Sequence, residues 1–140
     1  MRSTTIHSTT IHSITKLICA AALATTANIA AATEGWNYID TSLETAYQLY
    51  NIIDWAQTKY ISTHPQQYKE VNSAKYIGEH PSPATVDNAA IASAIIHYAI
   101  SRYIDNTTVR RIFQSVTLLD KYDATTGNTA IGIQLQFQWH

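Results

Sequence analysis

The sequence predicts a mainly α-helical protein, a three-helix bundle with an N-terminal signal helix and a C-terminal β-strand. Three observations predict it. Apolar residues recur at helical spacing in residues 39–61, 86–104 and 108–119. Residues 1–32 have the order of a secretory leader. Residues 131–140 alternate between apolar and polar, as a half-buried strand does. We therefore expect a helical domain over 33–130, between the leader and the strand.

The leader has the three parts of a cleaved signal peptide. Arg2 and Lys16 precede an apolar run over 17–32, and Ala30 and Ala32 fit a small-residue cleavage site. Polar residues near the middle of the run make it weak for a membrane span of about 20 residues. We expect export to the periplasm or the envelope membrane, with an uncleaved N-terminal anchor as the alternative.

Composition excludes several classes of function. Nine basic and ten acidic residues give no excess charge for nucleic acid. Charged residues make up 14%, against about 25% in ordinary soluble domains, which favours an exported or membrane-near protein. The single Cys19 lies in the leader, so a processed chain would have no disulfide and no cysteine-based site. Four scattered glycines form no phosphate-binding loop, and we expect no cofactor.

The first predicted helix carries two stripes, one apolar and one polar. The apolar stripe consists of Ile39, Leu43, Ala46, Tyr50 and Ile53 and is broken only at its end, by Gln57. The polar stripe consists of Asp40, Glu44, Gln48, Asn51, Asp54 and Thr58. An amphipathic helix with the apolar stripe against its neighbours is the simplest interpretation. Asp40 or Thr41 is the expected N-cap, with Glu44 completing a capping box. His64 precedes a proline and should end the helix.

The second and third helices differ in character. Between residues 89 and 100 only Ser93 and His97 interrupt the apolar residues, so this helix is predicted to be the central one or to dip into a bilayer. Ser82 or Thr85 is its expected cap. The third helix is expected to bury one apolar face, made of Val109, Ile112, Phe113, Val116 and Leu119.

The predicted tail strand requires a partner because one strand cannot satisfy its own backbone. Its apolar positions are Ile131, Ile133, Leu135, Phe137 and Trp139. The candidate partners are residues 33–38, a second copy of the chain (a homo-oligomer through 131–140), and a foreign sheet edge.

Few residues are candidates for chemistry. His64 and His80 each precede a proline with carboxylates nearby, but no helical metal-binding spacing connects them, and we expect no metal. His97 lies on an apolar helix, where a satisfied core histidine is the usual case. If it faced Asp54 or Glu44, the buried pair would be the best candidate for proton handling.

A series of short motifs resembles a family of small, uncharacterised proteins of Gram-negative bacteria and their phages. The motifs are Trp36, Asp40, Asp54-Trp55-x-Gln57-Thr58, Tyr68-x-Glu70-x-Asn72, Gly78-x-His80-Pro81-Ser82, Val86-Asp87 and Gly132-Ile-x-Leu-x-Phe. The resemblance implies a signal-like leader, two or three apolar helices and an envelope location, without an assigned reaction. It departs at Ser73-Ala74, where the family has Pro-Leu. Its polar residues, together with His97, give the candidate functional cluster: Asp54, Gln57, Glu70, Asn72, His80, Ser82, Asp87 and His97.

The sequence thus favours an exported envelope protein with a structural or interaction role over an enzyme. Its expected partners are an envelope protein or membrane lipid. Two alternatives stay open: an integral membrane protein concerned with lysis or envelope maintenance, and a small metal-binding or hydrolytic enzyme.

Overall fold

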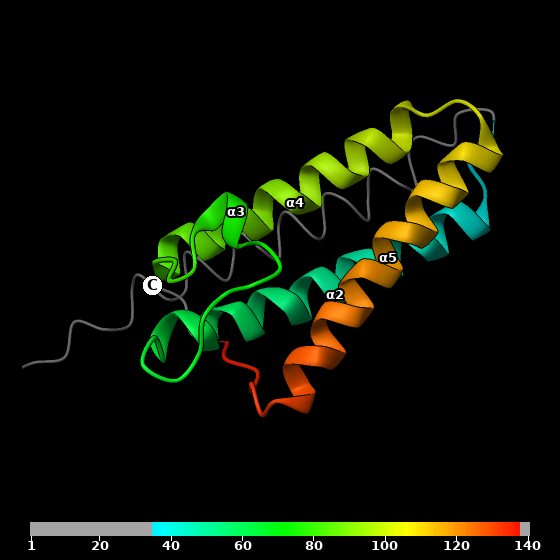
Figure 1. The fold of residues 1–140 in the computed structure, drawn as a ribbon. Helices are drawn as coiled ribbons and strands as arrows, with labels where there is room; N and C mark the ends of the chain where they lie inside the picture. Colours follow the sequence, from blue (N-terminus) through cyan, green and yellow to red (C-terminus); the bar gives the residue numbers. More distant parts are fainter. Residues whose placement is uncertain (1–34, 138–140) are drawn as a thin grey trace, which may run out of the picture.

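The computed structural model describes residues 35–137, which form three long helices and one short helix (Figure 1). The helices are α2 (Tyr38–Thr63), α3 (Ala74–Ile77), α4 (Pro83–Tyr103) and α5 (Thr107–Ala130). The mainly helical prediction is confirmed. The predicted signal helix and the last three residues of the predicted strand lie outside the described residues.

Helix α2 occupies the centre of the bundle. Both α4 and α5 pack along it, whereas α4 and α5 contact each other little and diverge from the turn that joins them (Figure 1). The prediction that residues 86–104 form the central helix is wrong. The reason is that α2 carries polar side chains that bond to both neighbours, while most of the isoleucines of α4 have no helix to cover them among the described residues.

The first two long helices share an apolar contact, as the sequence predicts. Trp55 and Ala56 of α2 pack against Val86 of α4, and Ala90 lies beside them. These three buried residues form the small apolar core near one end of the bundle. At about 25 cal/mol per Å² of buried apolar area, so small a cluster leaves much of the stabilisation to polar contacts.

The polar stripe of α2, and not the apolar one, faces the interior. Four of the six polar-stripe residues are buried (Asp40, Glu44, Asn51 and Thr58), and Gln48 and Asp54 are half-buried. The five apolar residues of the predicted apolar stripe are all only half-buried, and its last member, the polar Gln57, is buried. The predicted orientation of this helix is therefore wrong. Polar groups tolerate burial when each finds a hydrogen-bond partner, and α4 and α5 supply those partners.

Helix α5 shows the same reversal. Arg110, Gln114 and Thr125 are buried against α2. Four of the five residues predicted for its buried face are exposed, namely Val109, Ile112, Val116 and Leu119. The helix also runs to Ala130, beyond the predicted end at 119, because its inward face continues with polar residues that apolar periodicity does not register.

The helix ends follow local chemistry. Asn37 is the N-cap of α2, and Asp40 completes the capping box as the third residue of the helix. The prediction of Asp40 or Thr41 as the N-cap is therefore wrong. Ser82 caps α4 as expected, with Pro83 in the first turn. Helix α2 ends at Thr63, with His64 as its C-cap, as the following proline predicts.

The predicted C-terminal strand is not supported in the part of it that the structure describes, 131–137. These residues are irregular and lie against α2. Gly132, at φ +86°, turns the chain after α5, Ile133 is buried, and the Gln136 N–H donates to the Ala56 carbonyl at 3.1 Å. The described chain offers no strand edge, so the tail packs with its side chains instead of a backbone ladder.

Within residues 35–137, none of the helices combines the length and the apolar character that a membrane crossing needs.

Candidate functional site

A buried carboxylate–histidine pair lies between α2 and α4. His97 Nδ1 is 3.0 Å from Glu44 Oε2, and both side chains are almost fully enclosed. On its other side, His97 Nε2 is 2.7 Å from the Thr117 hydroxyl of α5. The sequence left Asp54 and Glu44 open as partners of His97. In the structure the partner is Glu44, not Asp54.

The surroundings of His97 decide what the pair can do. Its ring stacks on Tyr47 at 3.4 Å between centroids and faces Phe113 at 4.9 Å. The order hydroxyl, imidazole, carboxylate is that of a nucleophilic triad. However, the Thr117 hydroxyl is also within hydrogen-bond distance of the Phe113 carbonyl, at 2.8 Å, and the rings close off the imidazole. The arrangement joins three helices and leaves no room for a substrate at the imidazole.

Burial and charge act in opposite directions on Glu44. Burial favours the neutral acid, but the hydrogen bond and positive charge of His97, together with the Gln48 amide, outweigh it and lower the pKa of Glu44. Burial raises the pKa of the neighbouring Tyr47 phenol, whose hydroxyl is 2.9 Å from Ser93. Glu44 is therefore held as a carboxylate in the interior.

A second buried carboxylate, Asp40, connects the start of α2 with α5. Its Oδ1 lies 3.2 Å from Arg111 Nε and 3.4 Å from Arg110 Nε. Burial raises the pKa of Asp40, but the Asn37 N–H and the two guanidinium groups outweigh burial and leave it lowered. The Gln114 amide donates to the Asp40 carbonyl at 3.2 Å and to Glu44 at 3.4 Å. Gln114 thus links the two buried acids.

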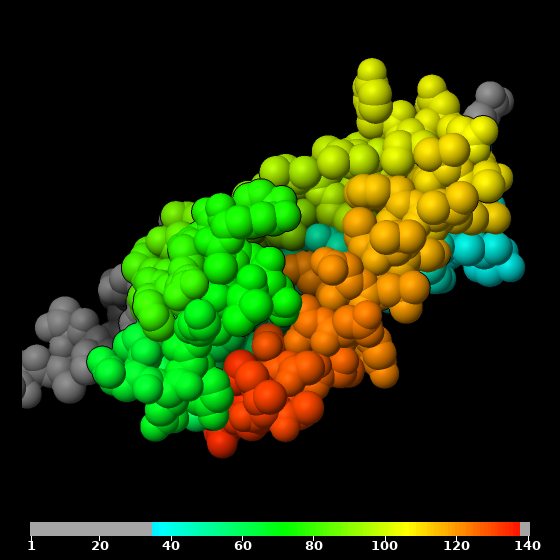
Figure 2. All heavy atoms as spheres, in the orientation of Figure 1, coloured from blue at the N-terminus to red at the C-terminus, as the bar shows by residue number. Residues whose placement is uncertain are grey.

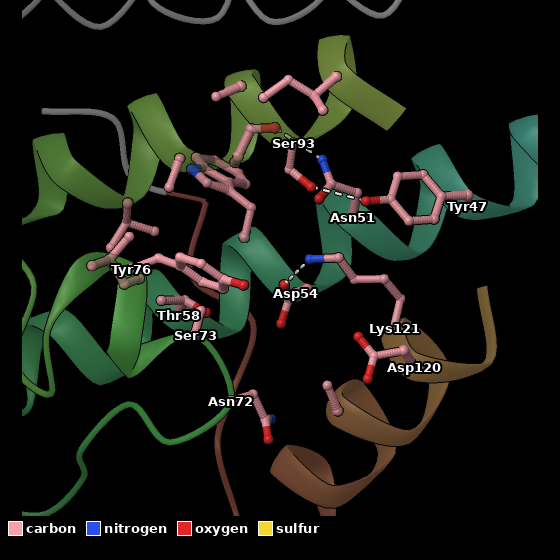
Figure 3. Close-up of a pocket in the computed structure, with 18 residues that line it drawn as sticks. Tyr47, Asn51, Asp54, Thr58, Asn72, Ser73, Tyr76, Ser93, Asp120 and Lys121 are labelled. Carbon is pink, nitrogen blue, oxygen red and sulfur yellow. Dashed lines mark hydrogen bonds and ion pairs between the residues drawn. The ribbon is translucent and has the colours of Figure 1, made fainter. Parts of the chain in front are cut away.

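A groove of about 580 Å³ opens between α4 and α5 over α2 (Figure 3). In the space-filling view, α2 is visible between the two diverging helices (Figure 2). Asp54 of α2 and Lys121 of α5 form an ion pair in this groove, and Asn72 lies at its rim. A pocket of this size can hold a small molecule, but Asp54 and Lys121, two of its three charged residues, already bond to each other.

Asp87 lies in a third polar cluster, near the small apolar core. Its carboxylate accepts a hydrogen bond from the fully buried Lys59 ammonium at 2.9 Å and from the Trp55 indole N–H at 2.8 Å. The Lys59 ammonium also donates to the Pro83 carbonyl at 3.3 Å. Asp87 therefore fastens the start of α4 to α2.

Two further candidates bond within the fold. The Gln57 amide donates to the Thr125 carbonyl and to the Thr129 hydroxyl, both at 3.0 Å. Glu70 is buried and accepts from the Ser73 N–H at 3.0 Å and the Thr58 hydroxyl at 3.4 Å. Each connects a loop or helix end to α2.

The remaining candidates lie on the surface, and the eight do not converge on one site. His80 and Asn72 are exposed, and Ser82 is the exposed cap of α4. Only Asp54 and Asn72 share the groove. Between residues 35 and 137, no group of three or more histidine, cysteine or acidic side chains gathers where it could hold a metal ion.

Sequence reasoning missed the basic and amide partners on the other helices. Lys59, Arg110, Gln114 and Lys121 each bond to an acid or carbonyl of a neighbouring helix. The available signal was the spacing of 110, 114, 117, 121 and 125, which lie on one helical stripe that holds no large apolar residue. That stripe could have been matched to the polar stripe of α2.

Comparison of this chain with family models, with curated proteins and with solved structures returned no match.

Proposed function

We propose that this chain is a structural or interaction protein of the cell envelope, which docks on a partner through the outer apolar side of α4 and α5. The observation that carries the proposal is the distribution of side chains. The charged groups of α2 are used between the helices, while large apolar residues remain outside. We call the latter the apolar exterior, and it consists of Ile95, Ile96, Ile100, Val109, Ile112, Val116 and Leu119.

An apolar exterior of this kind supports an interaction role. Single exposed apolar residues are common, but an apolar stripe along one face of a helix, such as Val109, Ile112, Val116 and Leu119 of α5, usually marks a surface that a partner covers. Each of the seven is between 41% and 60% exposed, and they lie on adjoining helices. Covering them would remove from water an area of the kind that drives protein association.

The envelope location depends on the leader pattern in 1–32 and on the resemblance to signal-bearing envelope proteins. A peripheral attachment fits α2 better than insertion does, because four charged residues, even when paired, are rare in a membrane-spanning segment.

Cell fractionation of the full chain tests the proposal. We expect recovery in the envelope fraction and release by a carbonate wash. Retention after the wash would favour the integral membrane alternative, and recovery in the cytosol would contradict export.

A charged substitution tests the docking surface in the same assay. Ile112→Lys should move the chain out of the envelope fraction or out of its native complex. Thr126→Lys is the matched control, since it adds the same charge at an exposed polar position of the same helix. Equal behaviour of the two variants would contradict docking through the apolar exterior.

A further inference from the structure

We infer that the groove between α4 and α5 is a binding site for a small organic cation, a molecule that carries an amine on an apolar body. The inference does not rest on the proposed docking function. Its basis is three features of the groove: an open volume between apolar walls, a buried amide oxygen without a donor, and an excess of negative charge (Figure 3).

The groove is open because the side chains that line it from α4 and α5 include several alanines. Ala89, Ala90 and Ala92 belong to the wall from α4, and Ala124 to the wall from α5. Such short side chains do not fill the space between two helices that diverge along α2 (Figure 1). The volume of about 580 Å³ lies within the roughly 300–1,000 Å³ of small-molecule sites. The size and the apolar walls predict a ligand with an apolar body.

Asn51 of α2 brings a hydrogen-bond acceptor to the groove. Its side chain is 4% exposed, and its Nδ2 donates to the Ala90 carbonyl at 3.1 Å. Because a carbonyl only accepts, this bond fixes the orientation of the amide and leaves Oδ1 as the other end. No residue between 35 and 137 donates to that oxygen. A buried acceptor without a donor is costly, so a ligand that supplies an N–H there gains a favourable bond.

The charges of the groove select a cation. Three charged residues line it, namely Asp54, Asp120 and Lys121. Lys121 pairs with Asp54, whereas the exposed Asp120 forms no ion pair with any described residue. Two acids against one base leave the groove with a net negative charge. An amine is positively charged at neutral pH and complements it.

Aromatic side chains supply further surface for the ligand. Tyr47 and Trp55 line the groove from α2 and are buried. Tyr76 of α3 lines it as well and is 77% exposed, and Figure 3 shows its ring extending toward Asp54. Aromatic rings pack against apolar groups and attract cations. Water would satisfy the Asn51 oxygen, but it would neither balance the charge nor cover these walls.

Three probes of similar size and different charge test the ligand class: phenylethylamine, phenylethanol and phenylpropanoate. In the purified full chain, we expect phenylethylamine to shift the amide NMR signals of Asn51 and Ser93 saturably, with a dissociation constant of about 1 mM or below. Phenylethanol should bind about threefold more weakly because it lacks the charge, and phenylpropanoate should bind most weakly. No saturable shift with phenylethylamine, or equally tight binding of either other probe, would overturn the inference.

A bulky side chain tests the location of the site. Ala92→Phe fills the groove from an exposed position of α4 and should weaken phenylethylamine binding about tenfold or more. Ala99→Phe is the matched control, since Ala99 is also exposed on α4 but does not line the groove. Circular dichroism should show both variants folded, because neither position is buried. Unchanged binding by Ala92→Phe, or an equal loss in Ala99→Phe, would overturn the location.

An isosteric substitution tests the charge. Asp120→Asn removes the unpaired carboxylate and should weaken phenylethylamine binding about threefold. Asp123→Asn is its control, because Asp123 is exposed on the same helix and lies outside the groove. Equal binding by the two variants would overturn the assignment of the ligand as a cation held by Asp120.

Discussion

The side of α5 that faces α2 and the side that faces outward have exchanged the composition expected of them. The inward side holds Arg110, Gln114 and Thr125, all buried. The outward side holds Val109, Ile112, Val116 and Leu119, each more than half exposed. The difference teaches that partner availability, and not side-chain polarity alone, decides which side of a helix a small bundle buries.

The same contrast separates two kinds of ion pair. The Asp40 contacts with Arg110 and Arg111 lie between helices, with Asp40 fully buried, whereas Lys69 and Glu79 pair on the surface at 3.5 Å. Buried pairs lose hydration and depend on complete partnership, while exposed pairs are screened by water. The contributions of the two pairs to stability should therefore differ widely.

Removal of the Asp40 carboxylate is expected to have the largest effect. Asp40→Ala leaves the buried Arg110 guanidinium, and the partly exposed one of Arg111, without their acid and should lower the free energy of unfolding by about 3–5 kcal/mol. Glu79→Ala, which removes a carboxylate from the exposed pair, should cost about 0–1 kcal/mol. Urea unfolding followed by circular dichroism measures both values. Similar losses in the two variants would show that the buried ion pair contributes no more to stability than the exposed one.

Truncation of the tail contact is expected to have an intermediate effect. Ile133→Ala removes a buried side chain of the tail and should cost about 2–3 kcal/mol. Leu135→Ala, at an exposed position of the same tail, should cost about 0.5 kcal/mol or less. The unfolding temperatures of the two variants show whether the tail packs on the bundle through Ile133. A tail that served only to dock on a foreign strand would show no difference.

Acidification should lower the stability of the folded chain, because it protonates the buried carboxylates of Asp40 and Glu44. The pKa values of Asp40 and Glu44 are lowered below their ordinary values of 3.8 and 4.5. A lowered folded pKa contributes stability that is complete above the ordinary value and is lost as the pH falls through the folded one. The urea midpoint should thus fall below about pH 4.5, and the double variant Asp40→Asn/Glu44→Gln should flatten that decline. Stability that rises over this pH range would contradict the assignment.

Much of the fold could be predicted from local patterns. The helix end at His64-Pro65 and the cap at Ser82 follow from turn chemistry, and the packing of α2 on α4 follows from periodicity, although periodicity did not identify Trp55 and Val86 as the residues that make the contact. The orientation of α2 could not, because both of its stripes have helical spacing. Which stripe is buried depends on side chains such as Arg110 and Gln114, some seventy residues away.

The candidate site was predicted less well than the fold. Periodicity identified His97 as a residue on an apolar helix, and the structure adds Glu44 and Thr117 as its partners. The motif residues Asp87, Gln57 and Glu70 bond to lysine, backbone or hydroxyl groups within the bundle. Order along the chain does not show whether a polar residue serves the fold or a ligand.

The central claim, that the bundle is stabilised by its polar interior and not by the apolar side of α5, is tested most directly by two alanine substitutions. The free energies of unfolding of Glu44→Ala and Ile112→Ala should be compared by urea titration at a protein concentration where the chain is monomeric. We expect a loss of about 3 kcal/mol or more for Glu44→Ala and about 0.5 kcal/mol or less for Ile112→Ala. A larger loss for Ile112→Ala than for Glu44→Ala would contradict the claim.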